Sequence, residues 1–277
     1  MNSPAATLAD EGKFEEAELM CREKLRLCRQ RFGDEDPDTL TCKDDLALFL
    51  FGRRKYGEAE VINCDTLKLR EEVLGDEHPH TLANMNNLAQ IFFWQGRYDE
   101  AETLHRKTLQ KRQKRLGDEH PDTLWSMANI ALVLLMQGKY KDAETMNRET
   151  LGLRRKVLGN RDPCTLTSMN NLTAALAMQG KYQEAEMMNR ETLALRQEVL
   201  GHKHSDTLSS MSNLAVVLLM KGMYEEAEAV NQKTLELRQE VFGNTHPHTL
   251  RNANIAALIS EGKEKGIKVS YMGLHLV

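Results

Sequence analysis

Residues 137–178 read QGKYKDAETMNRETLGLRRKVLGNRDPCTLTSMNNLTAALAM, and residues 179–220 read QGKYQEAEMMNRETLALRQEVLGHKHSDTLSSMSNLAVVLLM. The two stretches agree at 25 of 42 positions, which indicates an internal repeat. Outward from this pair, the same step of 42 residues continues through most of the chain. Three sets of residues keep this step: Gly33, Gly75, Gly117, Gly159, Gly201 and Gly243; Pro37, Pro79, Pro121, Pro163 and Pro247, with Ser205 in the gap; and Phe14, Tyr56, Tyr98, Tyr140, Tyr182 and Tyr224.

Each repeat has the pattern of two helices. From Leu82 to Phe92, apolar residues recur at spacings of three and four, which is the spacing of one helix face. Gly96 is placed to end this helix, because glycine readily adopts the left-handed conformation of a helix stop. A second and longer apolar stripe runs from Tyr98 to Leu116, and no segment alternates with the period of a strand.

A single helix pair cannot bury its own apolar face, so successive pairs must stack on one another. We therefore predict an all-α fold, an α-solenoid in which antiparallel helix pairs with a 42-residue repeat form a right-handed superhelix. Residues 1–262 are predicted to form one array of about six repeats with a truncated first repeat, and residues 263–277 an irregular tail. Because neither end offers a polar cap, we expect weak end-to-end self-association.

Composition and charge exclude several classes of protein. The net charge is −4 and Lys and Arg are not clustered, which argues against a nucleic-acid partner. The chain has no apolar run of the roughly 18 residues that a membrane span needs, and its start does not resemble a signal peptide. We therefore predict a cytoplasmic protein without a membrane partner. The five cysteines form no CxxC pair and are expected to be reduced thiols.

The sequence offers no set of residues for catalysis. Seven of the nine histidines lie in the turns between repeats: His78, His80, His120, His202, His204, His246 and His248. Their His-x-His spacing suits zinc, but it recurs because the turn recurs, so we predict no metal site. No nucleophile, base and acid are set together. We expect neither a cofactor nor enzymatic activity.

The pattern Met85-x-x-Leu88-Ala89-x-x-Phe92, Gly96-x-Tyr98-x-x-Ala101 resembles the tetratricopeptide signature, with Met in the usual place of Trp. The 42-residue period and the phrase LGDEHP-x-TL-x-x-M-x-NLA are more specific. They resemble the tetratricopeptide arrays of kinesin light chains and those of fungal NOD-like receptors. The heptads of the kinesin light chain coiled coil and the P-loop of the receptors are not found in this sequence.

The resemblance implies a concave groove lined by the first helix of each repeat. By position, it places one asparagine of each central repeat in the groove: Asn87, Asn129, Asn171 and Asn213. Such amides suit a peptide backbone, or alternatively bond a neighbouring repeat's backbone and stiffen the stack. The other candidate groove residues are apolar, except for two acids near the N-terminal end: Phe93, Trp94, Trp125, Met136, Met178, Asp44 and Asp45. The two tryptophans suit interface anchors, or alternatively fill gaps between repeats.

Two functions remain open from the sequence. The first is a non-catalytic scaffold or adaptor that holds a protein or peptide in its groove, as the likeness to kinesin light chains implies. The two tryptophans and the two acids favour an apolar or mildly basic peptide. The alternative is a ligand-sensing repeat region detached from a fungal NOD-like receptor, where binding would regulate an NTPase.

Overall fold

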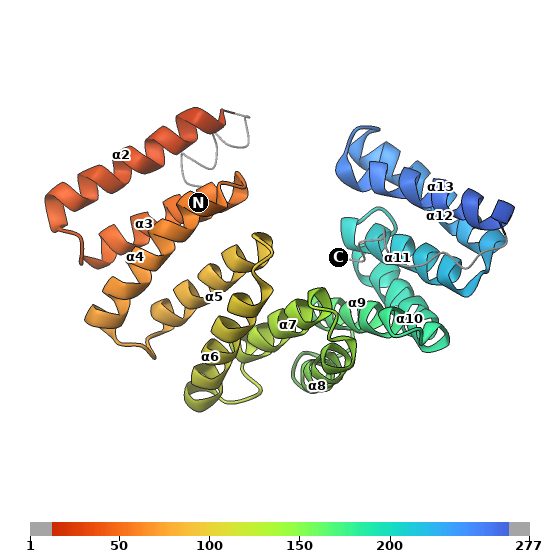
Figure 1. Cartoon of the computed structure of the whole chain (residues 1–277), viewed down its shortest axis with the longest axis horizontal. Coiled ribbons are helices and arrows are strands. Elements are labelled where there is room, and N and C mark those ends of the chain that lie inside the picture. The colour runs from red at the N-terminus through yellow and green to blue at the C-terminus, as the bar shows by residue number, and fades with distance from the viewer. Residues whose placement is uncertain (1–12, 266–277) are drawn as a thin grey trace. The chain divides into compact units, whose positions relative to one another are not determined.

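The computed structural model describes residues 13–265, and every element in this range is an α-helix (Figure 1). The first helices of the repeats are α3 (Pro37–Gly52), α5 (Pro79–Trp94), α7 (Pro121–Met136), α9 (Pro163–Met178), α11 (Ser205–Lys221) and α13 (Pro247–Lys265). The second helices are α2 (Phe14–Phe32), α4 (Tyr56–Leu74), α6 (Tyr98–Leu116), α8 (Tyr140–Leu158), α10 (Tyr182–Leu200) and α12 (Tyr224–Phe242). The all-α fold of helix pairs predicted from the repeat is confirmed.

The helices form two compact units, Met1–Val133 and Leu134–Val277, with the division inside α7. Within each unit, consecutive helices pack against one another as antiparallel pairs (Figure 1). In the second unit, the first helices α9, α11 and α13 also contact their neighbours of the same kind. The superhelix and the single array over residues 1–262 stay predictions.

The C-terminal boundary differs from the prediction. We expected an irregular tail from residue 263, but α13 continues through Gly262 to Lys265. Gly262 is buried in the helix and does not take a positive φ, so it does not act as a stop. Lys263 and Lys265 also suit the negative C-terminal end of the helix dipole. Residues 266–277, like residues 1–12, lie outside the described range, so the expected self-association stays a prediction.

Turn residues set the ends of the helices. Gly117 ends α6 with φ +85° and Gly96 follows α5 with φ +79°, conformations in which a Cβ would be strained. Four histidines of the turns are N-caps of the next helix, where the imidazole Nδ1 accepts a backbone N–H two residues on: His78, His120, His204 and His246. Asp36 and Asp162 do the same in the other two turns. The recurrent histidines therefore have a capping role.

In four of the second helices, a buried arginine makes the same two hydrogen bonds to the next first helix. Arg112 Nη1 donates to the carbonyl oxygen of Asp122 and to Ser126 Oγ, both at 2.9 Å. The same bonds, at the same offsets of 10 and 14 residues, recur at Arg154, Arg196 and Arg238. Burial lowers the pKa of Arg238 to about 10. These guanidinium groups fix the angle between the two helices without a carboxylate in the bond.

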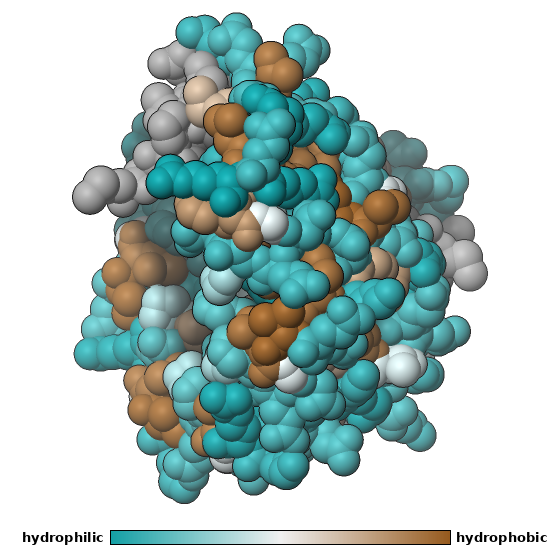
Figure 2. Space-filling model, turned by 90° about the vertical axis from the view of Figure 1, so that its left-hand side faces the viewer, coloured by the Kyte–Doolittle hydropathy of each residue, from teal (hydrophilic) through white to brown (hydrophobic). Residues whose placement is uncertain are grey.

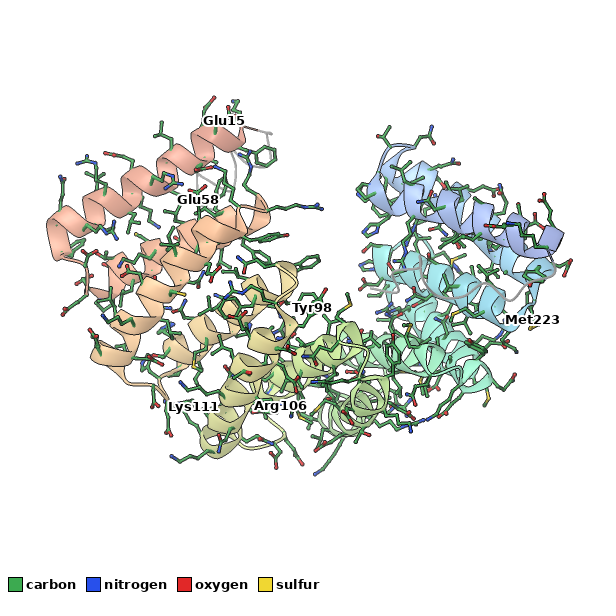
Figure 3. All side chains as sticks on the ribbon, viewed as in Figure 1. Glu15, Glu58, Tyr98, Arg106, Lys111 and Met223 are labelled. Atoms are coloured by element: carbon green, nitrogen blue, oxygen red, sulfur yellow. The ribbon has the colours of Figure 1, made fainter. Side chains whose placement is uncertain are left out.

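Ion pairs join successive second helices on the outside. Arg22 on α2 forms an ion pair with Glu58 on α4, and Figure 3 labels Glu58. In the second unit, Glu144 on α8 accepts hydrogen bonds from Lys181, Gln179 and Arg148. Burial alone would raise the pKa of Glu144, but these donors outweigh it and lower the pKa to about 2. Exposed ion pairs of this kind contribute little each to stability.

The first described helix pair differs from the others in its core, at Lys43. The following four repeats have methionine at the same position: Met85, Met127, Met169 and Met211. The Lys43 side chain is almost fully buried, and its Nζ contacts Asp65 at 2.6 Å and Asp34 at 3.7 Å. Both carboxylates are more than half exposed. Their attraction to the ammonium is therefore screened by water, and it offsets only part of the free-energy cost of burying that charge.

We expect Lys43→Met to raise the free energy of unfolding of the chain by about 1–2 kcal/mol, because a well-packed apolar side chain replaces a buried charge. The measurement is urea unfolding followed by circular dichroism. Lys43→Ala is the matched control and is expected to destabilise the chain, since it removes the charge but leaves a cavity. Equal losses of stability in both variants would contradict this account of the pair.

Candidate functional site

A hollow of about 160 Å³ opens in the first unit between α3, α4 and α5. We call it the Trp94 hollow, and its wall is formed by Ala47, Leu48, Phe51, Asn63, Asn87, Gln90, Ile91 and Trp94. The wall is largely apolar, with three amide side chains. It therefore brings together two of the residues predicted from the sequence, Asn87 and Trp94, about two turns apart on α5.

The three amides of the Trp94 hollow are not equivalent. Asn63 is buried, donates to the carbonyl oxygen of Ala59 at 3.1 Å and accepts from Asn84 at 2.6 Å. Asn87 and Gln90 are half-buried, and the side-chain amide of neither makes a hydrogen bond to another residue in the part of the chain that the structure describes. Their donors and acceptors are therefore available to a ligand at the edge of an apolar hollow.

Aromatic packing supports Trp94. The Trp94 side chain is 55% exposed, while Phe93 beneath it is only 8% exposed. The Phe93 ring meets the Trp94 ring edge-on at 5.7 Å and the Tyr98 ring at 5.5 Å, and Figure 3 labels Tyr98 at the start of α6. Phe93, which we predicted as a groove residue, therefore supports the tryptophan and offers little surface of its own.

Two of the four predicted asparagines are used between repeats. Asn129 Nδ2 donates to Asn86 Oδ1 at 3.0 Å, and Asn213 Nδ2 donates to Asn170 Oδ1 at 2.9 Å. Each bond joins first helices of adjacent repeats within one unit, side chain to side chain. The alternative that these amides stiffen the stack therefore applies to Asn129 and Asn213, although the partner is a side chain and not a backbone.

The other two predicted asparagines, Asn87 and Asn171, are half-buried and make no such bond within residues 13–265. The sequence explains the difference for Asn171, whereas the equivalent residue in the repeat before Asn87 is Asp44, whose carboxylate accepts from Arg70. The position that Asn86 and Asn170 hold is Ala128 in the repeat before Asn171, and alanine has no side-chain acceptor. The sequence analysis missed this signal: the doublet Asn-Asn occurs at 86–87 and 170–171, whereas residues 129 and 213 follow Ala and Ser.

Both predicted acids of the first unit already have cationic partners. Asp44 Oδ2 accepts from the buried Arg70 at 2.6 Å, and Asp45 accepts from Lys24 at 2.8 Å. Burial raises the pKa of Asp44, and the hydrogen bond from Arg70 offsets this only in part. Neither carboxylate lines the Trp94 hollow.

The remaining predicted residues lie apart from the Trp94 hollow. Trp125 on α7 is 51% exposed. Met136 and Met178 are the last residues of α7 and α9, at the position equivalent to Trp94, and both are half-buried. On the face drawn in Figure 2, hydrophobic side chains form separate patches in a mainly hydrophilic surface. The Trp94 hollow brings the exposed ring of Trp94 together with the half-buried amides of Asn87 and Gln90.

Within residues 13–265, no three His, Cys, Asp or Glu side chains are grouped so that they could hold a metal ion. In the same range, no helix combines the length and the apolar character needed to span a bilayer.

The comparisons with known proteins follow the repeat. A model of the Tetratricopeptide repeat matches residues 81–156, 148–198, 164–240 and 206–259, and a second model of the same description matches residues 1–38 and 39–80. Together they cover most of the chain, which belongs to the tetratricopeptide repeat family. No curated protein matches it.

Three solved structures illustrate the likeness of fold. A putative kinesin light chain of Podosopora anserina with nearly identical repeats is 23% identical over 70% of this chain and 92% of its own, with a TM-score of 0.64. A signal transduction ATPase with a tetratricopeptide repeat sensor from Pyrococcus horikoshii is 16% identical over 94% of this chain and 38% of its own, with a TM-score of 0.69. NprR, a quorum sensor of B. thuringiensis, in complex with its cognate peptide NprX, is 15% identical over 97% and 73%, with a TM-score of 0.60.

Proposed function

We propose that this chain is a non-catalytic interaction module that binds an apolar segment of a protein or peptide in the Trp94 hollow, and so serves as a scaffold or adaptor. The observation that carries the proposal is the hollow itself, where exposed Trp94 stands beside the uncommitted amides of Asn87 and Gln90. The family of the chain and the peptide complex of NprR, which has a similar fold, support it.

Binding would divide between side chain and backbone. One apolar side chain of the ligand enters between Phe51 and Trp94 and buries surface that water now covers. Asn87 and Gln90 then bond the ligand backbone on either side, which positions it without selecting its sequence. Because Phe93 holds Trp94 edge-on, the tryptophan is already oriented before the ligand arrives, and little side-chain entropy is lost.

The wall of the hollow favours an apolar ligand over a charged one. Leu48, Phe51 and Ile91 offer no partner for a charge, so a carboxylate or ammonium placed there would lose its hydration. The expected preference for basic segments depended on Asp44 and Asp45, which Arg70 and Lys24 already neutralise. We therefore propose an apolar segment without a required charge.

We expect Trp94→Ala to weaken binding of such a segment by about 2 kcal/mol, close to 30-fold in Kd, because the anchor of the hollow is removed. The ligand is obtained by selecting a random peptide library on the intact chain, and its Kd is measured by fluorescence anisotropy. Met187→Ala is the control, since Met187 is 65% exposed on α10 and far along the chain from the hollow. Selection of Asp- and Glu-rich peptides, or equal Kd values for both variants, would refute the proposal.

A second candidate is a sensor array whose ligand controls a separate NTPase. It draws on the likeness to the Pyrococcus ATPase, of which this chain covers 38%. Both candidates use the same kind of surface, so the Trp94→Ala experiment does not separate them. A P-loop NTPase domain encoded directly upstream of this chain, and co-purifying with it, would favour the sensor.

A further inference from the structure

Two cysteines face each other in the first described helix pair. Cys28 on α2 and Cys42 on α3 have their Sγ atoms 3.1 Å apart, which is about 1 Å longer than a disulfide bond. Cys42 is buried and Cys28 is half-buried, and both side chains are free thiols in this structure. A small shift of the two side chains would bring the sulfur atoms into bonding distance.

The repeat register shows that the two cysteines replace a structural pair. Cys28 stands at the position of the buried arginines, and Cys42 at the position of the Ser or Asn side chain that Arg112, Arg154, Arg196 and Arg238 bond 14 residues on. Arg112 and Ser126 are one such pair, with Nη1 and Oγ 2.9 Å apart. In this one repeat both partners have changed together, and to the same residue type, so a second interaction takes the place of the first.

The surroundings give the two thiols different roles. Cys42 lies in an apolar cluster with Leu25 and Leu46, and burial together with the hydrogen bond to Cys28 raises its pKa to about 11. Cys28 lies at the edge of this cluster and is open to solvent in part. Lys24, one turn before Cys28, adds a positive charge near the pair. An oxidant therefore reaches Cys28 first, and Cys42 is placed to react second.

We propose that Cys28 and Cys42 are a thiol modification site at which hydrogen peroxide forms a reversible disulfide between α2 and α3. The Cys28 thiolate attacks one peroxide oxygen, the O–O bond breaks, and a sulfenic acid and hydroxide result; the hydroxide takes up the proton that the Cys28 thiol released and becomes the first water. The Cys42 sulfur then attacks the sulfenic sulfur, the S–O bond breaks, and the lost hydroxyl leaves as the second water with the thiol proton. Two thiols and one peroxide thus give one disulfide and two waters, and a dithiol reductant reverses the change.

The disulfide would close a short loop that holds the end of α2, the turn and the start of α3. Closing this loop restricts the unfolded chain, so the oxidised protein is expected to unfold at a higher denaturant concentration than the reduced protein. The disulfide would attach α2 to α3, and α3 contributes Leu48 and Phe51 to the wall of the Trp94 hollow. Oxidation therefore stabilises one wall of the hollow without touching a residue that lines it.

The test uses the full chain and hydrogen peroxide. Mass spectrometry after maleimide labelling should show the five free thiols fall to three, and peptide mapping should find Cys28 linked to Cys42. Dithiothreitol should restore all five. The control is Cys164→Ser, which should still lose two thiols, because Cys164 is exposed on α9 and belongs to no pair.

The double variant Cys28→Arg, Cys42→Ser restores the pair of the other repeats, so it should fold and keep its three thiols under the same peroxide. Loss of two thiols in this variant would overturn the proposal. A map that links Cys42 to Cys21, or peroxide that consumes the exposed Cys64 and Cys164 while Cys28 and Cys42 stay reduced, would overturn it as well.

Discussion

Replacing Arg196 with alanine is expected to lower the free energy of unfolding by about 3 kcal/mol, one of the largest effects of any single change in the chain. The Arg196 side chain is buried, and its Nη1 donates to the carbonyl oxygen of Asp206 and to Ser210 Oγ. Alanine leaves both acceptors without this donor and leaves a cavity between α10 and α11. The measurement is urea unfolding followed by circular dichroism.

Arg196→Met separates volume from hydrogen bonding in this experiment. Methionine fills most of the space but donates nothing, and it also removes a charge whose burial lowers the pKa of Arg196. We expect this variant to lose less than half as much stability as Arg196→Ala, because removal of the buried charge offsets the lost bonds. Equal losses would show that the two hydrogen bonds, and not the filled space, hold the helix pair.

The second large effect is a loss of stability in acid that depends on His105. His105 on α6 is fully buried, and neither ring nitrogen has a hydrogen-bond partner among residues 13–265. Burial, with a smaller effect of the cationic Arg112, lowers the pKa of His105 to about 4. In the unfolded chain a histidine has a pKa of about 6.5, so the unfolded chain binds the proton first. The contribution of His105 is complete above about pH 6.5 and is lost as the pH falls towards 4.

Between pH 7 and pH 5 this linkage should cost the protein about 2 kcal/mol of unfolding free energy. His105→Asn is the matched control, because four other repeats have asparagine at this position: Asn63, Asn147, Asn189 and Asn231. The histidine N-caps are present in both chains, so their contribution cancels in the difference. If the two proteins lost the same stability over this interval, His105 would not be the group that responds.

Most of the fold could be predicted from the sequence, because the same helix-pair pattern recurs in each of the six repeats. The second helices begin at Phe14 and its five tyrosine equivalents, as the spacing predicted. The irregular tail was expected from residue 263, whereas α13 runs to Lys265 and Gly262 lies within it without a positive φ. The sequence also gave no account of the arginine at positions such as Arg112, because a polar residue on an apolar stripe does not reveal its partner.

The candidate site was less predictable. Trp94 and Asn87, two of the predicted groove residues, both line the Trp94 hollow, and their role in binding stays a prediction. Position alone could not distinguish Asn87 from Asn129, because their roles depend on the residue one repeat earlier and not on their own helix. The partner of Asp44 could not be predicted for a similar reason, because Arg70 lies on another helix. Whether a polar side chain has a hydrogen-bond partner depends on two residues at once, so it cannot be predicted from one sequence position.

The hydrogen bonds between repeats join residues that are close together in the sequence. The amides of Asn86 and Asn129 are 43 residues apart, and the guanidinium of Arg112 and the hydroxyl of Ser126 only 14. Closing such short loops costs little chain entropy, and contacts of this kind form quickly. During synthesis, a repeat can therefore complete its hydrogen bonds as soon as the next repeat has left the ribosome, before the rest of the chain exists. Apolar helix faces are then covered in the order in which they are made, so little unburied surface is open to aggregation at any moment.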